Sequence, residues 1–222
     1  MCGRYGFVPG TNFDERFQVE HRQETLLPSY NVAPGATMPV VVRNSPNRVE
    51  LMKWGLIPFW AKDPKISYKT INARAETVAT TPAFREAFKR RRCLVPASGF
   101  YEWQKTERGK IPYFIHLKDT ELFAFAGLYD VWKDAEGQEL RTYTILTTTP
   151  NALMQPIHDR MPVILQPDDE GTWIDPGAND PVSLLSLLKP FPAELMEAYT
   201  VSRAVNSPAN DSHELLTPVD YE

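Results

Sequence analysis

The second residue, Cys2, carries the most distinctive chemistry in the chain. If Met1 is removed, Cys2 presents two adjacent nucleophiles, an α-amine with an ordinary pKa of about 7.7–8.0 and a thiol of about 8.5. Such a 1,2-aminothiol captures aldehydes, because the amine forms a Schiff base and the sulfur then closes a five-membered ring. While Met1 is attached, the amine is blocked. A free cysteine more often serves packing, so the other residues must decide between the two interpretations.

Two other segments carry acid–base groups. Glu102 stands between two aromatic residues, and an apolar cage raises the pKa of a carboxyl until it exchanges protons near neutrality. In a strand those neighbours point to the other face, so a solvent-facing Glu102 is an equal alternative. His158 precedes Asp159, which would set its tautomer and pKa, and Arg160, which suits an anion. A lone histidine is more often structural, but here it offers the second half of a site.

A third region has features of single-strand binding. Residues 54–60 (WGLIPFW) place Trp54 and Trp60 on either side of a turn, and core packing is the favoured interpretation of such aromatics. The alternative is a platform on which unpaired bases stack. Basic residues follow directly, and cations beside exposed aromatics are typical of proteins that grip single strands. Asn72 would supply an amide hydrogen bond and Arg74 a bidentate phosphate contact, although surface turns also look like this.

Composition narrows the class of protein. A chain of 222 residues with 42% hydrophobic residues is globular, and its 20 prolines favour short strands and structured loops over long helices. Two cysteines exclude a disulfide framework and leave no Cys/His cluster at zinc spacing. No signal peptide, membrane span, Walker loop or dinucleotide fingerprint is present. We expect a cytoplasmic monomer without cofactor, metal or membrane contact.

The charge is unevenly distributed along the chain. Residues 1–110 hold 18 Lys and Arg against 10 Asp and Glu, a balance of +8, whereas residues 111–222 hold 6 against 18, a balance of −12. The net charge of −4 argues weakly against a general nucleic-acid binder. The basic half is either one positive face for a polyanion or a chance division of the solvated surface.

The elements that must position these groups are mostly strands. Apolar runs predict strands over residues 38–43, 49–54, 93–96, 112–117, 122–129, 141–148 and 199–201, the first two as a hairpin. Partial periodicity and caps predict helices within residues 11–29, 81–91, 168–173 and 180–188, and a short helix from Pro150. The expected fold is α+β, with a largely antiparallel, barrel-like sheet and short flanking helices. We expect a single domain over residues 1–222, irregular beyond about residue 207 and with a mobile end.

Taken together, six segments resemble the SRAP family, the SOS-response-associated peptidase-like proteins. They are residues 1–4 (MCGR), 31–34 (NVAP), 54–60 (WGLIPFW), 71–77 (INARAET), 99–103 (GFYEW) and 157–162 (IHDRMP), with 201–202 and 205–206 in addition. Each motif is weak alone, but together they cover nearly the whole chain in the family's order.

The resemblance implies a protein of the DNA damage response that recognises abasic sites in single-stranded DNA and shields them. It implies an autoprocessing, peptidase-like and lyase-like activity: Met1 is removed autocatalytically, and Cys2 then forms a thiazolidine with the sugar aldehyde. By the same resemblance Asn72 hydrogen-bonds the opened sugar, and Glu102 and His158 move protons.

The resemblance also maps phosphate contacts onto Arg4, Arg74 and Arg160. It maps base contacts more loosely onto Trp54 and Trp60, since the family separates bases with aromatics near this segment.

Two other functions remain open. Class II glutamine amidotransferases also begin Met-Cys-Gly, so one alternative is an N-terminal-nucleophile amidohydrolase in which the Cys2 thiol attacks the amide of glutamine. In the other alternative the chain is a noncovalent single-strand DNA-binding module, in which Cys2 is incidental.

Overall fold

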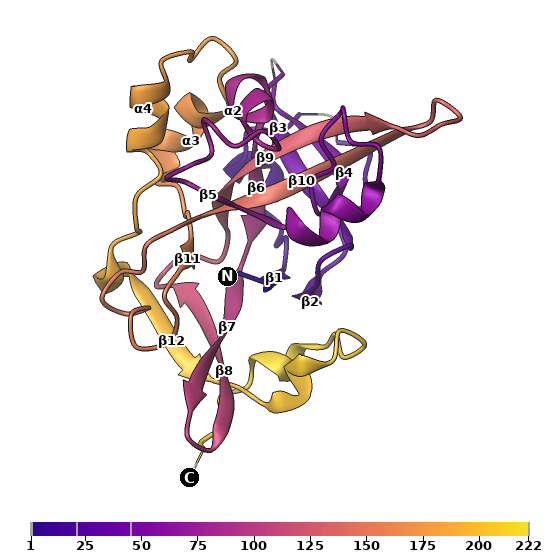
Figure 1. Ribbon diagram of the computed structural model, residues 1–222. Helices are drawn as coiled ribbons and strands as arrows, with labels where there is room; N and C mark the ends of the chain where they lie inside the picture. The colour runs from indigo at the N-terminus through magenta and orange to yellow at the C-terminus, as the bar shows by residue number, and fades with distance from the viewer. Residues whose placement is uncertain (1, 21, 45, 222) are drawn as a thin grey trace.

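The strands of the protein form two β-sheets (Figure 1). The computed structural model describes residues 2–20, 22–44 and 46–221. In the five-stranded sheet all neighbours are antiparallel, in the order β12-β8-β7-β1-β2. Its strands are β1 (Arg4–Phe7), β2 (Ser29–Val32), β7 (Gly99–Thr106), β8 (Gly109–Leu117) and β12 (Met196–Thr200).

The second sheet closes on itself. Strands β10, β4, β3, β6 and β9 pair in this order, and β9 pairs with β10 again, so these five strands complete a ring. Only the β4–β10 pair in the ring is parallel; β5 and β11 add to β10. The strands are β3 (Thr37–Val42), β4 (Arg48–Trp54), β5 (Asn72–Arg74), β6 (Arg92–Ala97), β9 (Phe123–Lys133), β10 (Glu139–Thr148) and β11 (Met161–Pro162).

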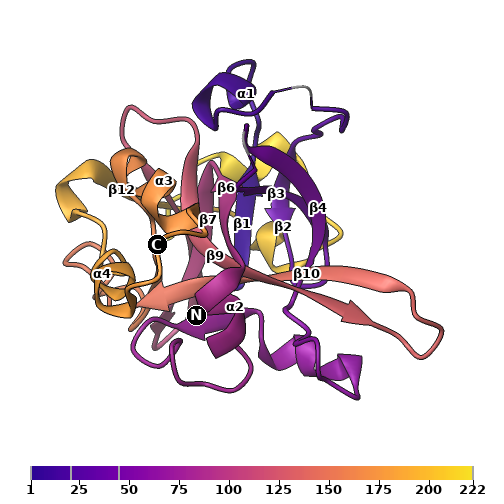
Figure 2. The same ribbon diagram turned by 90° about the horizontal axis from the view of Figure 1, so that it is seen from above.

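The helices are short and lie at the periphery of the strands, as the view from above shows (Figure 2). The α-helices are α1 (Phe13–Arg16), α2 (Arg85–Arg90), α3 (Pro167–Ile174) and α4 (Pro181–Ser186). The 3₁₀ helices are η1 (Pro64–Lys69), η2 (Ala193–Leu195), η3 (Arg203–Asn206) and η4 (His213–Leu216). This architecture confirms the predicted α+β fold, with its mostly antiparallel, barrel-like sheet.

One hydrophobic core joins the two sheets behind the N-terminal strand. Tyr5 of β1 meets Trp54 of β4 edge-on at 5.3 Å between ring centroids, and Trp54 stacks on Tyr143 of β10. The two tyrosine hydroxyls share a hydrogen bond of 2.7 Å. All three rings are buried, and each contributes on the order of 2 kcal/mol or more to folding. Strand β1 is therefore held in place by packing against β4 and β10.

The predicted hairpin of β3 and β4 is confirmed, with Val41 opposite Val49, but three helix predictions need correction. Among residues 11–20 and 22–29 the structure has only the four-residue α1, because Gln18 adopts a left-handed φ of 53° that a helix cannot contain. Helix α2 begins at Arg85, after turns over residues 82–84. The segment after Pro150 forms hydrogen-bonded turns without a regular helix.

The segment beyond residue 207 contains η4 and packs against the five-stranded sheet. Leu215 is 3% exposed, and Asp211 accepts a hydrogen bond from the hydroxyl of Ser29 on β2. The backbone here is irregular, and these contacts tie it to β2; the mobility of the extreme end stays a prediction.

Candidate active site

Cys2 lies two residues before β1. The antiparallel register of β1 and β7 pairs Arg4 with Tyr101, the residue that precedes Glu102. Cys2 is fully buried. Its burial, together with the negative charge of nearby Glu102, raises the pKa of the thiol far above its ordinary value. The thiol of Cys2 is therefore neutral in the folded protein. The predicted removal of Met1 concerns a residue outside the described part of the chain.

Glu102 is buried, with 3% of its surface exposed. The sequence allowed either a carboxyl enclosed by apolar side chains or one that faces solvent, and in the structure the carboxyl of Glu102 is buried. Burial raises the pKa of its carboxyl to about 7. At neutral pH both protonation states are therefore well populated, which is what a group that donates and accepts protons in one reaction needs.

His158 lies directly beside Glu102. Its Nε2 is 3.9 Å from Oε2 of Glu102, and its side chain is 26% exposed. Burial lowers the pKa of the imidazole, so the ring is predominantly neutral near pH 7. The backbone N–H of Arg160 donates to Nδ1 at 3.0 Å. This bond places the single ring proton of neutral His158 on Nε2, facing Glu102.

Asn72 begins β5, opposite Ile145 of β10, and its Nδ2 donates to the Ile145 carbonyl at 3.3 Å. Its Oδ1 is buried and has no hydrogen-bond partner among the residues that the structure describes. A buried acceptor without a hydrogen-bond donor costs free energy. The Oδ1 of Asn72 is therefore suited to accept a hydrogen bond from the hydroxyl of a ligand.

The three arginines predicted to bind phosphate differ in their surroundings. Arg74 is exposed at the end of β5. Arg4 donates to Oδ1 of Asn31 and to the Val205 carbonyl, both at 2.8 Å. Arg160 makes a two-pronged bond to Glu76, at 2.6 and 2.9 Å. Arg74 thus faces solvent, whereas a phosphate on Arg4 or Arg160 would have to share or displace a bond within the protein.

The two tryptophans also differ, and the prediction for Trp54 is corrected. Trp54 is 1% exposed, and its indole N–H donates to the Ile71 carbonyl at 2.8 Å. It is a core residue and has no surface on which a base can stack. Trp60 is 49% exposed and follows Phe59, which is 54% exposed, on the turn before η1. Of the two, Trp60 has the surface that base stacking requires.

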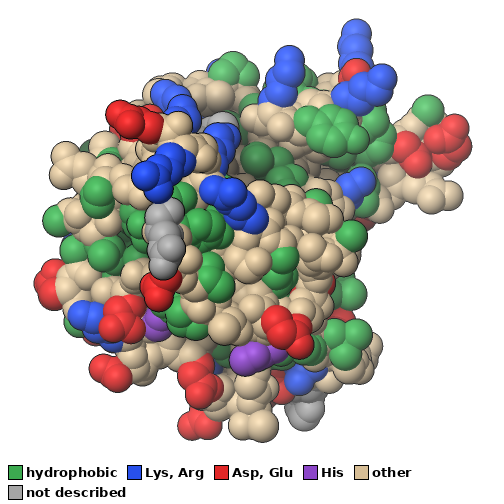
Figure 3. Space-filling model, turned by 90° about the horizontal axis from the view of Figure 1, so that it is seen from below, with side chains coloured by type: hydrophobic (Ala, Val, Ile, Leu, Met, Phe, Trp, Pro, Cys, Tyr) green, Lys and Arg blue, Asp and Glu red, His purple; other side chains and the backbone are tan. Residues whose placement is uncertain are grey.

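Trp60 borders a hollow of about 370 Å³ whose wall is basic. Lysines of and before η1 line it, namely Lys62, Lys65 and Lys69. Seen from below, Lys and Arg side chains gather over the upper half of the molecule beside exposed hydrophobic side chains (Figure 3). Cations beside exposed aromatics are suited to a nucleic-acid strand.

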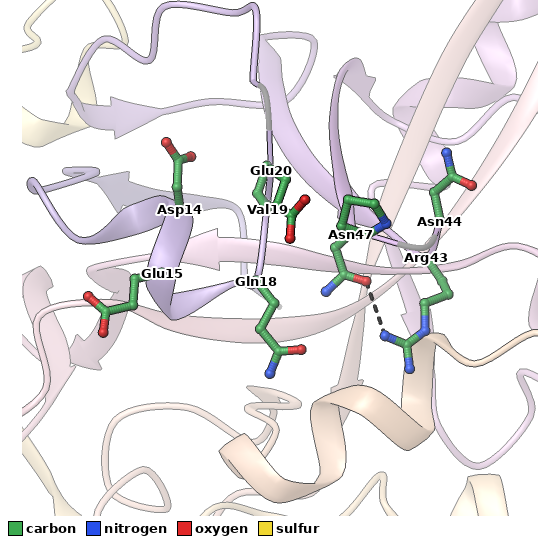
Figure 4. Close-up of a pocket in the computed structure, with 9 residues that line it drawn as sticks. Asp14, Glu15, Gln18, Val19, Glu20, Arg43, Asn44 and Asn47 are labelled. Atoms are coloured by element: carbon green, nitrogen blue, oxygen red, sulfur yellow. Dashed lines mark hydrogen bonds between the residues drawn. The ribbon is translucent and has the colours of Figure 1, made fainter.

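A larger hollow of about 540 Å³ lies elsewhere, between α1 and the turn from β3 to β4 (Figure 4). Its wall carries the carboxylates of Asp14, Glu15 and Glu20, while Arg43 donates to Asn47 at 3.3 Å. None of the predicted site residues lines it. An acidic wall repels phosphates, so this hollow does not compete with the site around Cys2.

Two residues next to the site escaped assignment from the sequence. Glu76 belongs to the 71–77 motif but carried no predicted role, and Asn31 belongs to the 31–34 motif. Asn31 donates from Nδ2 to the carbonyls of Val205, Ser207 and Asn210 at 3.2, 3.0 and 2.7 Å. Their place in motifs was the available signal, but their partners lie far away in the sequence.

Within residues 2–20, 22–44 and 46–221, no group of three or more His, Cys, Asp or Glu side chains is arranged to hold a metal ion. Among the helices of the described chain, none is long and apolar enough to cross a membrane.

The fold is α+β, and its candidate site combines a cysteine near the start of the chain with a buried carboxyl group and a neutral imidazole. Residues 1–208 match the family described as SOS response associated peptidase (SRAP). The chain belongs to this family.

Relatives cover the chain almost completely. It is similar to the abasic site processing protein YoqW of Bacillus subtilis, with 49% identity over 97% of this chain and 99% of that protein. The abasic site processing protein HMCES of Gallus gallus is 34% identical over 90% of this chain and 68% of that protein. A crystal structure of a protein from Bacteroides thetaiotaomicron has 32% identity and a TM-score of 0.87, covering 98% of this chain and all of that one.

Proposed function

We propose that this protein recognises abasic sites in single-stranded DNA and joins itself to them through a thiazolidine at Cys2, once Met1 has been removed. The observation that carries the proposal is that Cys2 lies near enough to the carboxyl of Glu102 for that group's charge to act on the thiol, and that this carboxyl has a pKa of about 7. The names of the relatives, which are abasic site processing proteins, support the substrate.

The reaction needs two proton-transfer groups. An abasic sugar is mostly a closed hemiacetal, so a base must take the hydroxyl proton while an acid protonates the ring oxygen before the aldehyde appears. Glu102 and neutral His158 stand side by side and suit this exchange. In this proposal the Oδ1 of Asn72 accepts a hydrogen bond from the opened sugar.

The covalent steps balance with loss of one water. The α-amine of Cys2 attacks the aldehyde carbon to give a carbinolamine, and protonation of its hydroxyl expels water and leaves a Schiff base. The Cys2 sulfur then adds to the same carbon, and its proton passes to the nitrogen. Because burial keeps the thiol protonated, we propose that the amine attacks first.

The proposed activity includes autoprocessing. Hydrolysis of the Met1–Cys2 peptide bond releases methionine and frees the amine, a peptidase-like step that needs no pocket for another protein.

Binding of the strand relies on the outer surface. In this proposal Arg74 contacts phosphate and Trp60 contacts a base, with the lysines near η1 alongside. Phosphate contacts position the strand without reading its sequence, so binding tolerates any sequence and weakens with salt.

The test is the intact mass after incubation with a single-stranded oligonucleotide that bears one abasic site. We expect the mass of protein without Met1 plus oligonucleotide minus water, and no such product with Cys2→Ala. Cys2→Ser keeps the amine but lacks sulfur, so its adduct should survive denaturation only after borohydride reduction of the Schiff base.

No adduct from protein that has lost Met1 would overturn the proposal. Glutamine hydrolysis would then be measured, because it marks the amidohydrolase alternative. An adduct of equal yield from Cys2→Ala would instead indicate that Cys2 is incidental.

A further inference from the structure

Glu76, which follows β5, holds the guanidinium of Arg160 in a fork. Its two carboxylate oxygens accept bonds from Nη1 and Nη2 at 2.6 and 2.9 Å. Nη2 also donates to the Thr147 carbonyl of β10 at 2.6 Å. The Arg160 side chain is 14% exposed and that of Glu76 is 46% exposed. Planar two-pronged bonds of this kind fix geometry as well as charge.

The backbone of Arg160 in turn acts on His158. Two groups compete for Nδ1 of the imidazole: the Arg160 N–H donates to it at 3.0 Å, and Oδ1 of Asp159 lies 3.0 Å away. A proton on Nδ1 would suit Asp159, whereas a lone pair on Nδ1 suits the Arg160 N–H. The Asp159 side chain is 89% exposed, so solvent weakens its pull on the proton.

We propose that Glu76 and Arg160 are positioning residues, which hold the Arg160 N–H against Nδ1 of His158 and so keep the imidazole proton on Nε2, facing Glu102. The inference rests on the proposed function, in which His158 exchanges protons with the sugar. It assigns Glu76 a role and gives Arg160 one other than phosphate contact.

A positioning role for Glu76 and a place in a phosphate-binding site make different predictions for Glu76→Gln. The variant keeps the size of the side chain but replaces one acceptor oxygen with an NH₂ group that cannot accept from Arg160. If Glu76 merely occupied a phosphate site, its neutralisation would tighten DNA binding. If it positions His158, binding stays the same and the bound complex reacts more slowly.

The experiment measures the rate of adduct formation against oligonucleotide concentration in single turnovers, with protein free of Met1. For Glu76→Gln we expect the rate at saturation to fall about tenfold, because a positioned acid–base group contributes on the order of 10²–10⁴ and is only partly misplaced here. The half-saturating concentration should change less than about twofold. Glu139→Gln is the matched control, since Glu139 is 48% exposed and pairs with Lys133 at 3.2 Å on another element.

Imidazole ¹⁵N shifts provide a second readout, assigned to His158 by comparison with His158→Ala. The folded protein should show the proton on Nε2, and Glu76→Gln should show a mixture with Nδ1. Arg160→Lys keeps the positive charge but loses the fork, so it should behave like Glu76→Gln.

An unchanged imidazole spectrum, or a tighter half-saturation at an unchanged saturating rate, overturns the inference. The spectrum is recorded without DNA, so it tests whether Glu76 and Arg160 set the position of the imidazole proton even if no adduct forms. Absence of adduct from the wild-type protein would overturn the proposed function instead.

Discussion

Burial sets the proton chemistry of the individual site residues. It raises the pKa of Cys2 and Glu102 and lowers that of His158. All three shifts favour the neutral form, because each group leaves water for a less polar environment. The site thus carries little charge of its own and keeps its proton donors and acceptors ready near neutral pH.

Glu102 should lower the stability of the protein at neutral pH. Its pKa rises on folding from an ordinary 4.5 to about 7, so the folded chain binds this proton more tightly than the unfolded chain. The stabilising contribution is complete below about pH 4.5 and is lost as pH rises through 7. For Glu102→Gln, which does not titrate, the free energy of unfolding relative to wild type should grow by about 3 kcal/mol from pH 4.5 to above pH 7. Urea unfolding across this range measures it, and a pH-independent difference would contradict it.

Strand β9 and its neighbours hold the aromatic turn before η1 in place. The carboxylate of Asp130 accepts from the Phe59 N–H at 3.1 Å, and the indole N–H of Trp132 donates to the Ala61 carbonyl at 2.7 Å. Arg91 pairs with the same aspartate at 3.1 Å. These contacts fix the turn that carries the exposed rings of Phe59 and Trp60 to strand β9.

At the other end of the site, the segment after β12 is tied to β1 and β2 by Asn31. Its side chain donates to three carbonyls beyond residue 200, and its oxygen accepts from Arg4. Truncation leaves several of these groups without partners, so Asn31→Ala should lower the free energy of unfolding by roughly 2–4 kcal/mol.

Urea unfolding measures the effect, with Asn12→Ala as control. Asn12 is exposed and its side chain makes no capping bond, so its loss should change stability by less than about 0.5 kcal/mol. Equal effects of the two substitutions would contradict the role given to Asn31.

At the scale of the whole molecule, the basic half of the chain supplies the lysines beside which we propose that the DNA strand binds. Lys62, Lys65 and Lys69 stand near Trp60. Each phosphate contact to single-stranded DNA contributes about 0.7 to the slope of log affinity against log salt. Replacing all three lysines with Ala should therefore flatten this slope by about 2.

Fluorescence anisotropy with an intact oligonucleotide isolates binding from the covalent step. Lys89→Ala is the control, because Lys89 lies on α2 and pairs with Glu86 at 3.6 Å. It should leave the slope as it is. A slope unchanged by the triple substitution would remove these lysines from the interface.

The sequence alone determined the elements whose signals are local. The β3–β4 hairpin, the strands of the barrel and the α+β class follow from alternation, turns and proline content, and the aminothiol chemistry follows from the position of Cys2. The same reasoning extended the helix within residues 11–29 too far, because a single left-handed residue, Gln18, ends it. Local periodicity carries no sign of such a residue.

Only the tertiary structure decided which residues are buried and which partners they meet. Two tryptophans six residues apart are equivalent in the sequence, yet Trp54 packs into the core and Trp60 faces solvent. Glu102 acquires its raised pKa from the chain that surrounds it, and Glu76 meets Arg160 across 84 residues. Burial and long-range pairing depend on how the strands assemble, and local sequence patterns do not encode these distances.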